Sequence, residues 1–428
     1  MASFALTAYR SLSPLLPALL SMVSQWIPKL KTFADARSGL FPELEARLRA
    51  VPEPSSRLWV HASSVGEFEQ ARPVIAELLQ QVPGLDVVVS FFSDSGYEAR
   101  KSYPDAAAVF YLPLDTPDNA RKLVSLLKAD IFMLMRYDFW PNQLEAIKES
   151  GAKMVLAAAA LPPGSPYLKP GLKGLYRDLF AMFDDIFTID QPGCEAFQSA
   201  FGCLSARKAG DPRFDQVYER QKKSDDRAAK LKPLFPGRMV LVGGSTWEPD
   251  EAILVPAWQP LRKKLSLVLV PHKVEGSNID RIMENLRQKK IPAVTISSMD
   301  AAFDPEKQVL VVDQTGYLAE LYAIASIAYV GGAFGINVHN TIEPAVHGIP
   351  VLFGPRHGNS PEAAGLIEAG AATVVNDQRE LQDALERFVT DPGYLKKSGA
   401  KAAAFVQERL GATAVIAMAI EQYCSSKN

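Results

Sequence analysis

Two series of short apolar runs, separated by segments with helical character, constrain the fold of this sequence most. The first series contains LWVHA, DVVVSFF, AVFYLP, DIFMLM, KMVLAAAA and DIFTID, and the second contains MVLVGG, LSLVLVP, AVTIS, VLVVD, IAYVGG and VLFG. Runs of this length alternating with helices are typical of a parallel sheet covered by helices. The pattern predicts an α/β protein with two Rossmann-like parallel-sheet domains, and ligands are expected at the carboxyl ends of their strands.

The length of 428 residues suits two such domains of about 200 residues each. A charged segment short of large apolar residues begins at Val217, and Pro233 and Pro236 punctuate its end. We therefore expect a first domain over residues 35–216, a linker over 217–235, and a second domain over 236–428 that ends in an alanine-rich helix. Residues 1–34 form a separate N-terminal segment.

Residues 327–357 combine a buried strand, a glycine loop, a helix start and a second strand in one βαβ-sized unit. Gly331, Gly332 and Gly335 allow the backbone to approach a ligand closely. A helix start behind such a loop offers free N–H groups and the positive end of a dipole, which favour phosphate. His339 and Glu343 are four residues apart and would share one face of that helix. An ordinary tight turn between a strand and a helix is the alternative interpretation.

The overall composition is that of a globular protein, with 48% hydrophobic and 22% charged residues. A net charge of -2 argues against nucleic acid as the main partner. Three cysteines, at positions 194, 203 and 424, show no paired metal-ligand spacing, so we expect a reduced compartment and no zinc site.

The segment between Arg10 and Lys29 contains no charged residue and is rich in leucine. Pro14 and Pro17 weaken it as a membrane-spanning helix, so we predict an interfacial anchor; a spanning helix or a helix docked on the protein are the alternatives. The basic residues that follow predict that the rest of the chain stays on the cytoplasmic side of the membrane: Lys29, Lys31 and Arg37.

Six further motifs end predicted strands or begin predicted helices. They are HASSVGE (61–67), RYDFWPN (136–142), GDPRFD (210–215), GGSTWEPDE (243–251), VPHK (270–273) and DQTGY (313–317). Taken alone, Ser64 and Glu67 match a helix capping box, S-x-x-E. Ser245 or Thr246 would cap the next helix or contact phosphate.

In order and spacing, these motifs and the 327–357 unit resemble the 3-deoxy-D-manno-octulosonic acid (Kdo) transferases of lipopolysaccharide synthesis. The family pattern GG…HN-x-x-E…G-x-P-V-x-x-GP is matched, and the resemblance extends from about residue 61 to residue 357. It implies a GT-B glycosyltransferase, with two domains facing a central cleft. The implied reaction transfers Kdo from CMP-Kdo to a lipid A precursor (lipid IVA) with inversion, at the cytoplasmic face of the inner membrane of a Gram-negative bacterium. The implied partners are CMP-Kdo, the lipid A precursor and a membrane surface; no cofactor and no metal are expected.

The resemblance also implies roles for individual residues. Glu67 corresponds to the family's general base, and the other catalytic positions are Arg136 and Arg213. The donor-binding positions implied are His272, Lys273, Thr315, Gly316, Tyr317, Asn340, Thr341, Ile342 and Glu343. Further possible site residues are Ser64, Asp138, Ser245, Thr246 and His339.

The chain departs from the family pattern at several of these positions. Arg136 stands where an acidic residue is usual, and Tyr317 replaces a glutamate. Arg213 keeps the charge of a lysine and adds bidentate geometry. Arg136 paired with Asp138 in a salt bridge, and Arg213 as a structural tether at the hinge, remain open as alternatives.

Two other functions remain open. One is a different GT-B nucleotide-sugar enzyme such as an epimerase, and the other is a catalytically silent homologue that binds nucleotide. The apolar N-terminal segment counts against the epimerase, and Glu67 counts against both.

Overall fold

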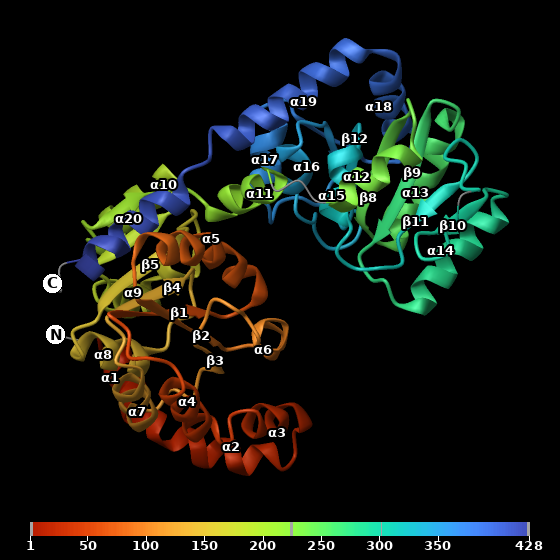
Figure 1. Cartoon of the computed structure of the whole chain (residues 1–428). Coiled ribbons are helices and arrows are strands. Elements are labelled where there is room, and N and C mark those ends of the chain that lie inside the picture. Colours follow the sequence, from red (N-terminus) through yellow and green to blue (C-terminus); the bar gives the residue numbers. More distant parts are fainter. Residues whose placement is uncertain (1–2, 223–225, 301, 426–428) are drawn as a thin grey trace. The chain divides into compact units, whose positions relative to one another are not determined.

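The computed structural model describes residues 3–222, 226–300 and 302–425, which divide into two compact units (Figure 1). Unit 1 contains residues 1–216 together with 410–428, and unit 2 contains residues 217–409. Each unit is built on a seven-stranded parallel sheet. The predicted α/β class with two parallel-sheet domains is confirmed.

The sheet of unit 1 has the strand order β3-β2-β1-β4-β5-β6-β7, and every pairing is parallel. Its strands are β1 (Ser56–Ala62), β2 (Leu85–Phe91), β3 (Ala108–Tyr111), β4 (Ile131–Met135), β5 (Lys153–Ala159), β6 (Asp185–Thr188) and β7 (Ala206–Lys208). The chain runs outward in one direction from β1 and in the other direction from β4. The adjacent carboxyl ends of β1 and β4 therefore form the topological switch point, where ligands collect in such sheets.

Helices cover both faces of this sheet. They are α4 (Leu40–Arg49), α5 (Val65–Gln81), α6 (Asp94–Arg100), α7 (Pro117–Leu127), α8 (Pro141–Glu149), α9 (Pro170–Phe180), α10 (Gln191–Phe201) and α20 (Ala412–Ser425), with the 3-10 turn η2 (Pro166–Leu168). Side chains alternate between the two cores along each strand, as in β1, where Trp59 joins one core and Val60 the other. All three cysteines are free and buried.

The terminal helix α20 packs in unit 1, although the sequence placed residues up to 428 in the second domain. Ile416 and Ile420 are fully buried in the same core as the apolar face of α5. The carboxylate of Asp215 accepts hydrogen bonds from the backbone N–H groups of Gly411 and Thr413, both at 2.7 Å, and so ties down the start of this helix. Burial of one apolar face explains why these residues belong to unit 1.

The N-terminal segment consists of short helices rather than one long one: α1 (Phe4–Leu12), η1 (Ser13–Leu15), α2 (Leu16–Ser24) and α3 (Pro28–Asp35). Its inner side is anchored, because Leu6 is 3% exposed and the Tyr9 hydroxyl donates to Asp115 at 2.8 Å. Its outer side is apolar and exposed, including Phe4, Leu12, Leu15, Leu19, Met22, Trp26 and Ile27.

The sheet of unit 2 has the order β10-β11-β9-β8-β12-β13-β14 and is also parallel. Its strands are β8 (Met239–Thr246), β9 (Leu265–Pro271), β10 (Ala293–Thr295), β11 (Val309–Val311), β12 (Ile327–Val330), β13 (Val351–Phe353) and β14 (Ala372–Val374). The switch point lies between β8 and β12.

The helices of unit 2 include two that occupy much of the predicted linker. The two helices in the predicted linker are the end of α11 (Pro212–Lys222) and α12 (Asp226–Leu231). The other helices of unit 2 are α13 (Glu248–Trp258), α14 (Gly276–Gln288), α15 (Leu318–Ile324), α16 (Ile342–Val346), α17 (Pro361–Glu368), α18 (Gln378–Thr390) and α19 (Pro392–Gln407), with the 3-10 turns η3 (Lys232–Leu234) and η4 (Gln259–Leu261). The predicted linker over 217–235 is thus largely helical where it is described.

One stretch, Pro392–Ser425, is long and apolar enough to span a membrane by length and composition alone. It comprises α19 and α20, which are separate helices. Buried side chains from both helices pack within the protein, including Phe405 of α19 and Ile416 of α20. Core packing therefore accounts for part of its apolar character.

Candidate functional site

In unit 1, predicted site residues gather at the carboxyl ends of β1 and β4. His61, at the end of β1, is 1% exposed, and its Nε2 lies 2.9 Å from Asp138 Oδ2 in the loop after β4. The other ring nitrogen lies 2.8 Å from Ser90 Oγ on β2. Because both ring nitrogens of the buried His61 have partners, the ring fixes the Asp138 carboxylate at the carboxyl ends of β1 and β4.

Glu67 lies in the first turn of α5, beside this pair. Its Oε2 accepts a hydrogen bond from the backbone N–H of Ser63 at 2.6 Å, and its own N–H donates to Ser64 Oγ at 3.4 Å. Burial raises the pKa of Glu67, and the nearby charge of Asp138 adds to the rise, while Ser63 N–H, His61 and Arg136 oppose it. A carboxylate with a raised pKa at the switch point is suited to accept a proton.

Arg136 follows β4 with a backbone φ of 60°, in the left-handed region that a non-glycine residue seldom occupies. Its Nε donates to Gln70 Oε1 at 2.8 Å, and Gln70 Nε2 donates in turn to Asp211 Oδ1 at 3.0 Å. Asp211 also pairs with Arg213, whose Nη2 lies 2.7 Å from Oδ2. Burial would raise the pKa of Asp211, but Arg213 and then Arg136 hold it below its usual range.

The sequence-predicted residues of unit 1 therefore form a single polar edge. The charges of Arg136 and Asp138 both act on the pKa of Glu67, and Arg213 connects to Arg136 through Gln70 and Asp211. Ser64 is the N-cap of α5. Sequence reasoning missed Gln70, which reads as an ordinary position in an amphipathic helix.

In unit 2, a cavity of about 320 Å³ opens near the switch point, among the ends of β8, β9 and β12 and the starts of α15 and α16. Of the predicted residues, it brings together Ser245, His272, Gly316, His339, Asn340 and Glu343. The lining residues that sequence reasoning missed are Arg220, Leu318, Ala319, Tyr322 and Val330. Arg220 was missed because its charged segment resembled a linker.

Three aromatic rings stack beside this cavity. The His272 ring lies 4.8 Å from Trp247 and 4.4 Å from His339, measured between ring centroids, and Trp247 Nε1 donates to His339 Nε2 at 3.0 Å. Burial lowers the pKa of both histidines, and the charge of Lys273 lowers that of His272 further. Burial and the charge of Lys273 thus favour the neutral form of the His272 ring.

The glycines after β12 approach the protein's own backbone rather than an open space. A Cβ atom at Gly331 would collide with the backbone of Ser245, and Gly332 has a φ of 96° and donates its N–H to Asp250 Oδ2 at 2.9 Å. The first helical N–H behind the loop, that of Ile342, donates to Asn340 Oδ1 at 3.0 Å. Some of the backbone N–H groups that the sequence predicted to be free for phosphate therefore bond to side chains of the protein itself.

Other predicted donor-binding residues lie outside the lining of this cavity. Thr246 is buried and its hydroxyl donates to Glu251 at 3.1 Å; Thr341 and Ile342 are fully buried. The remaining ones are Lys273, Thr315 and Tyr317. His339 and Glu343 do not share a helix face, because α16 begins only at Ile342.

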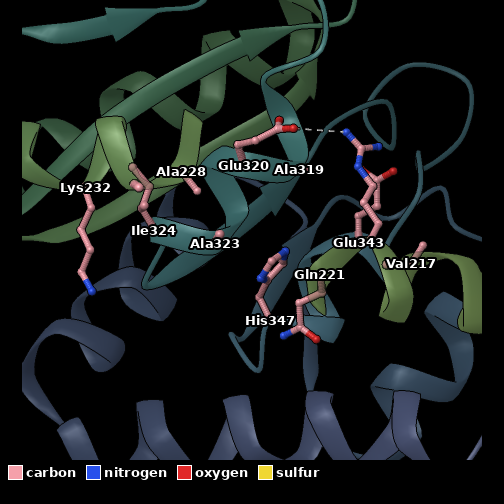
Figure 2. Close-up of a pocket in the computed structure, with 12 residues that line it drawn as sticks. Val217, Gln221, Ala228, Lys232, Ala319, Glu320, Ala323, Ile324, Glu343 and His347 are labelled. Atoms are coloured by element: carbon pink, nitrogen blue, oxygen red, sulfur yellow. Dashed lines mark ion pairs between the residues drawn. The ribbon is translucent and has the colours of Figure 1, made fainter. Parts of the chain in front are cut away.

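A second cavity, of about 410 Å³, lies among α11, α12, α15 and α16, and Glu343 contributes to both cavities (Figure 2). Glu320 is buried and lies 3.6 Å from Arg220, the ion pair dashed in Figure 2. Burial raises the pKa of Glu343 and, with the charge of Arg220, lowers that of His347 to about 4. Glu343 therefore lies on the walls of both cavities.

The chain is similar to known proteins over most of its length. The family model described as 3-deoxy-D-manno-octulosonic-acid transferase (kdotransferase) matches residues 36–216. The 3-deoxy-D-manno-octulosonic acid transferase of Bordetella pertussis is 27% identical, with 93% of this chain and 92% of that protein covered. The enzyme of the same name from Aquifex aeolicus is 29% identical, with 78% and 86% covered.

The match over residues 36–216 and the similarity of most of the chain to these enzymes confirm the resemblance to the Kdo transferases. These relatives are glycosyltransferases, as the motifs predicted. The solved structure of the UDP-GlcNAc 2-epimerase from Neisseria meningitidis bound to UDP-GlcNAc superimposes with a TM-score of 0.60 at 13% identity, covering 86% of this chain and 100% of that one. This likeness shows that the two proteins share a fold.

Proposed function

We propose that this relative of the Kdo transferases moves Kdo from CMP-Kdo to a lipid A precursor (lipid IVA), with inversion at the anomeric carbon. The observation that carries the proposal is the position of Glu67, a carboxylate of raised pKa at the switch point of a family-matched unit. The proposal takes the identity of the sugar from the names of the relatives. It takes the general base from the position of the Glu67 carboxylate.

In the proposed reaction, the Glu67 carboxylate takes the proton from the acceptor hydroxyl as that oxygen attacks the anomeric carbon of Kdo. The bond from that carbon to the CMP phosphate breaks in the same step, and CMP leaves with the electron pair. One displacement of this kind inverts the anomeric carbon. The residues needed are thus a base at the acceptor and cationic groups for the anionic donor.

The cavity near the switch point of unit 2 is the proposed nucleotide site. The carboxylate of Glu343 can accept hydrogen bonds from sugar hydroxyls, and Asn340 offers an exposed amide beside it. Arg220 brings a positive charge to the same cavity, which suits the phosphate. Among the described residues there is no group of three or more His, Cys, Asp or Glu side chains that could hold a metal ion. The proposed reaction uses no cofactor, and protein groups stabilise the leaving phosphate.

The N-terminal helices are proposed to lie on the membrane that holds the lipid acceptor. Exposed apolar side chains line α1 and α2, and Trp26 at their end is 83% exposed. Exposed Lys29 and Lys31 follow, which suits anionic headgroups, whereas Arg37 donates to the carbonyls of Leu112 and Phe92 and is used within the fold. We place this surface on the cytoplasmic face of the inner membrane.

A direct assay tests the function. Purified protein is incubated with CMP-Kdo and tetraacyl lipid A precursor, and mass spectrometry follows the acceptor. The expected result is a mass gain of one or more Kdo residues together with release of CMP. An unchanged acceptor, with folded protein and intact donor, would contradict the proposal. Parallel incubation with UDP-GlcNAc tests the epimerase alternative.

A further inference from the structure

Gln70, together with Asp211, links the two predicted catalytic arginines of unit 1. It lies in the middle of α5 and is 1% exposed, yet both ends of its amide are used. Its Oε1 accepts from Arg136 Nε at 2.8 Å and its Nε2 donates to Asp211 Oδ1 at 3.0 Å. The charges of the partners fix the amide orientation, because only oxygen can accept from a guanidinium and only nitrogen can donate to a carboxylate.

The bond to Gln70 occupies only one of the nitrogens of Arg136. In the part of the chain that the structure describes, Nη1 and Nη2 of Arg136 have no protein hydrogen-bond partner. The residue is partly exposed at the carboxyl end of β4, close enough to Glu67 to lower the pKa of that carboxyl. The guanidinium is thus held at its inner nitrogen and presents its outer two toward solvent at the site edge.

We propose that Gln70 is a positioning residue that aims the Nη groups of Arg136 at an anionic group of the substrate. Asp211, which is paired with Arg213, accepts a hydrogen bond from the Gln70 amide and fixes its orientation. The Gln70 amide in turn accepts from Arg136 and fixes the orientation of the guanidinium. This role rests on the proposed glycosyl transfer and adds to it a residue that never touches substrate. A neutral amide suits the position, since a buried charge between a cation and an anion would repel one of them.

The alternative is that Gln70 is merely a satisfied polar group in the core. The two roles differ in what Arg136 does when Gln70 is changed. A structural role lowers the stability of the protein when Gln70 is changed, and it leaves the kinetics of folded enzyme unchanged. A positioning role acts on turnover only through Arg136, so its kinetic effect disappears once Arg136 is gone.

A double-mutant cycle separates these roles. kcat and KM for CMP-Kdo are measured for wild type, Gln70→Met, Arg136→Met and the double variant, with thermal unfolding of each. We expect Gln70→Met to lower kcat/KM by about tenfold or more, which is the order of one hydrogen bond to a charged group, and to change it by less than about twofold in the Arg136→Met background. An equal loss in both backgrounds, or no loss in the single variant, would overturn the proposal.

Two additions keep the test decisive. If Gln70→Met does not fold, Gln70→Asn replaces it in the same cycle, because its amide is one methylene too short to bridge both partners.

The second addition follows the Arg136 Nε–H resonance by NMR. We expect this proton to exchange slowly with solvent in wild type and rapidly in the Gln70 variant. Unchanged exchange would overturn the proposal without reference to activity. Wild type that transfers no Kdo refutes the proposed function, whereas active wild type with an additive cycle refutes only the role of Gln70.

Discussion

The carboxylate of Glu67 accepts a hydrogen bond from the backbone N–H of Ser63 at 2.6 Å, so the proposed base is also part of the N-terminal cap of α5. This bond comes from the residue before the N-cap, so the reciprocal bond of the predicted capping box is not formed, but a capping role and a catalytic role of Glu67 remain compatible. Ser64 supplies the other half of the cap through its hydroxyl. The two functions can be separated by changing one residue at a time.

Ser64→Ala removes the hydroxyl cap but leaves the Glu67 carboxylate in place. We expect it to lower the free energy of unfolding by about 0.5–2 kcal/mol, the usual cost of a lost N-cap, while turnover stays within a few-fold of wild type. Denaturant unfolding and initial-rate assays measure both effects. A large loss of turnover without loss of stability would assign Ser64 to the chemistry instead.

The raised pKa of Glu67 predicts the acid side of the pH–rate profile. A base works only when deprotonated, so kcat/KM should fall as pH drops through the pKa of Glu67, above the pKa of about 4.3 for an ordinary glutamate. Arg136 lowers the pKa of Glu67 and Asp138 raises it. Arg136→Met should therefore move the acid limb to higher pH and Asp138→Asn to lower pH. If the acid limb moved in the same direction in both variants, a group other than Glu67 would control the acid side of the pH–rate profile.

Position 136 also tests whether the departure from the family pattern is functional. Arg136→Glu restores the commoner acid, but here it places a negative charge beside Glu67 and an anionic donor. We expect it to lower kcat/KM more than Arg136→Met does. Full activity of both variants would remove this position from the reaction.

The unit 2 cavity predicts where the nucleotide is bound. Asn340→Ala and Glu343→Ala should weaken CMP affinity by roughly three- to tenfold or more, the range for one lost hydrogen bond, with little change in the unfolding midpoint. Asn376→Ala is the matched control, because Asn376 is exposed and bonds to Glu380 away from the cavity. Calorimetric titration with CMP that gives the same affinity for all three variants would exclude the cavity.

The exposed N-terminal apolar surface predicts binding to lipid. Leu15→Ser, Leu19→Ser and Trp26→Ser together should reduce sedimentation with anionic phospholipid vesicles by on the order of tenfold or more, because the buried apolar area sets this affinity. Leu204→Ser is the control, since Leu204 is 85% exposed but lies outside the segment. Equal vesicle binding by the triple variant and wild type would remove the membrane role.

The sequence predicted the two sheets well because burial on both faces makes each strand a continuous apolar run. It also predicted that the motifs containing Glu67, Arg136 and Asp138 follow strand ends, whereas the adjacency of these strands, β1 and β4, is known only from the sheet order. It could not predict the link from Arg136 to Gln70, because a contact across 66 residues leaves no local pattern.

Local patterns also misled in places. The glycines after β12 suggested a ligand loop, but Gly331 makes room for the backbone of Ser245 and Gly332 bonds to Asp250. The N-terminal segment looked separable, yet Tyr9 bonds to Asp115 and Leu6 is buried. Whether a feature serves packing or a ligand depends on its tertiary neighbours, which spacing along the chain does not reveal.

The most direct test of the account compares wild type with Glu67→Gln in transfer of Kdo from CMP-Kdo to the lipid A precursor. Glutamine keeps an oxygen for the Ser63 N–H but cannot take a proton. The account predicts equal CMP affinity, a nearly unchanged unfolding midpoint, and turnover lower by roughly two to four orders of magnitude. Turnover of Glu67→Gln within a few-fold of wild type would contradict it and leave Glu67 as a helix cap alone.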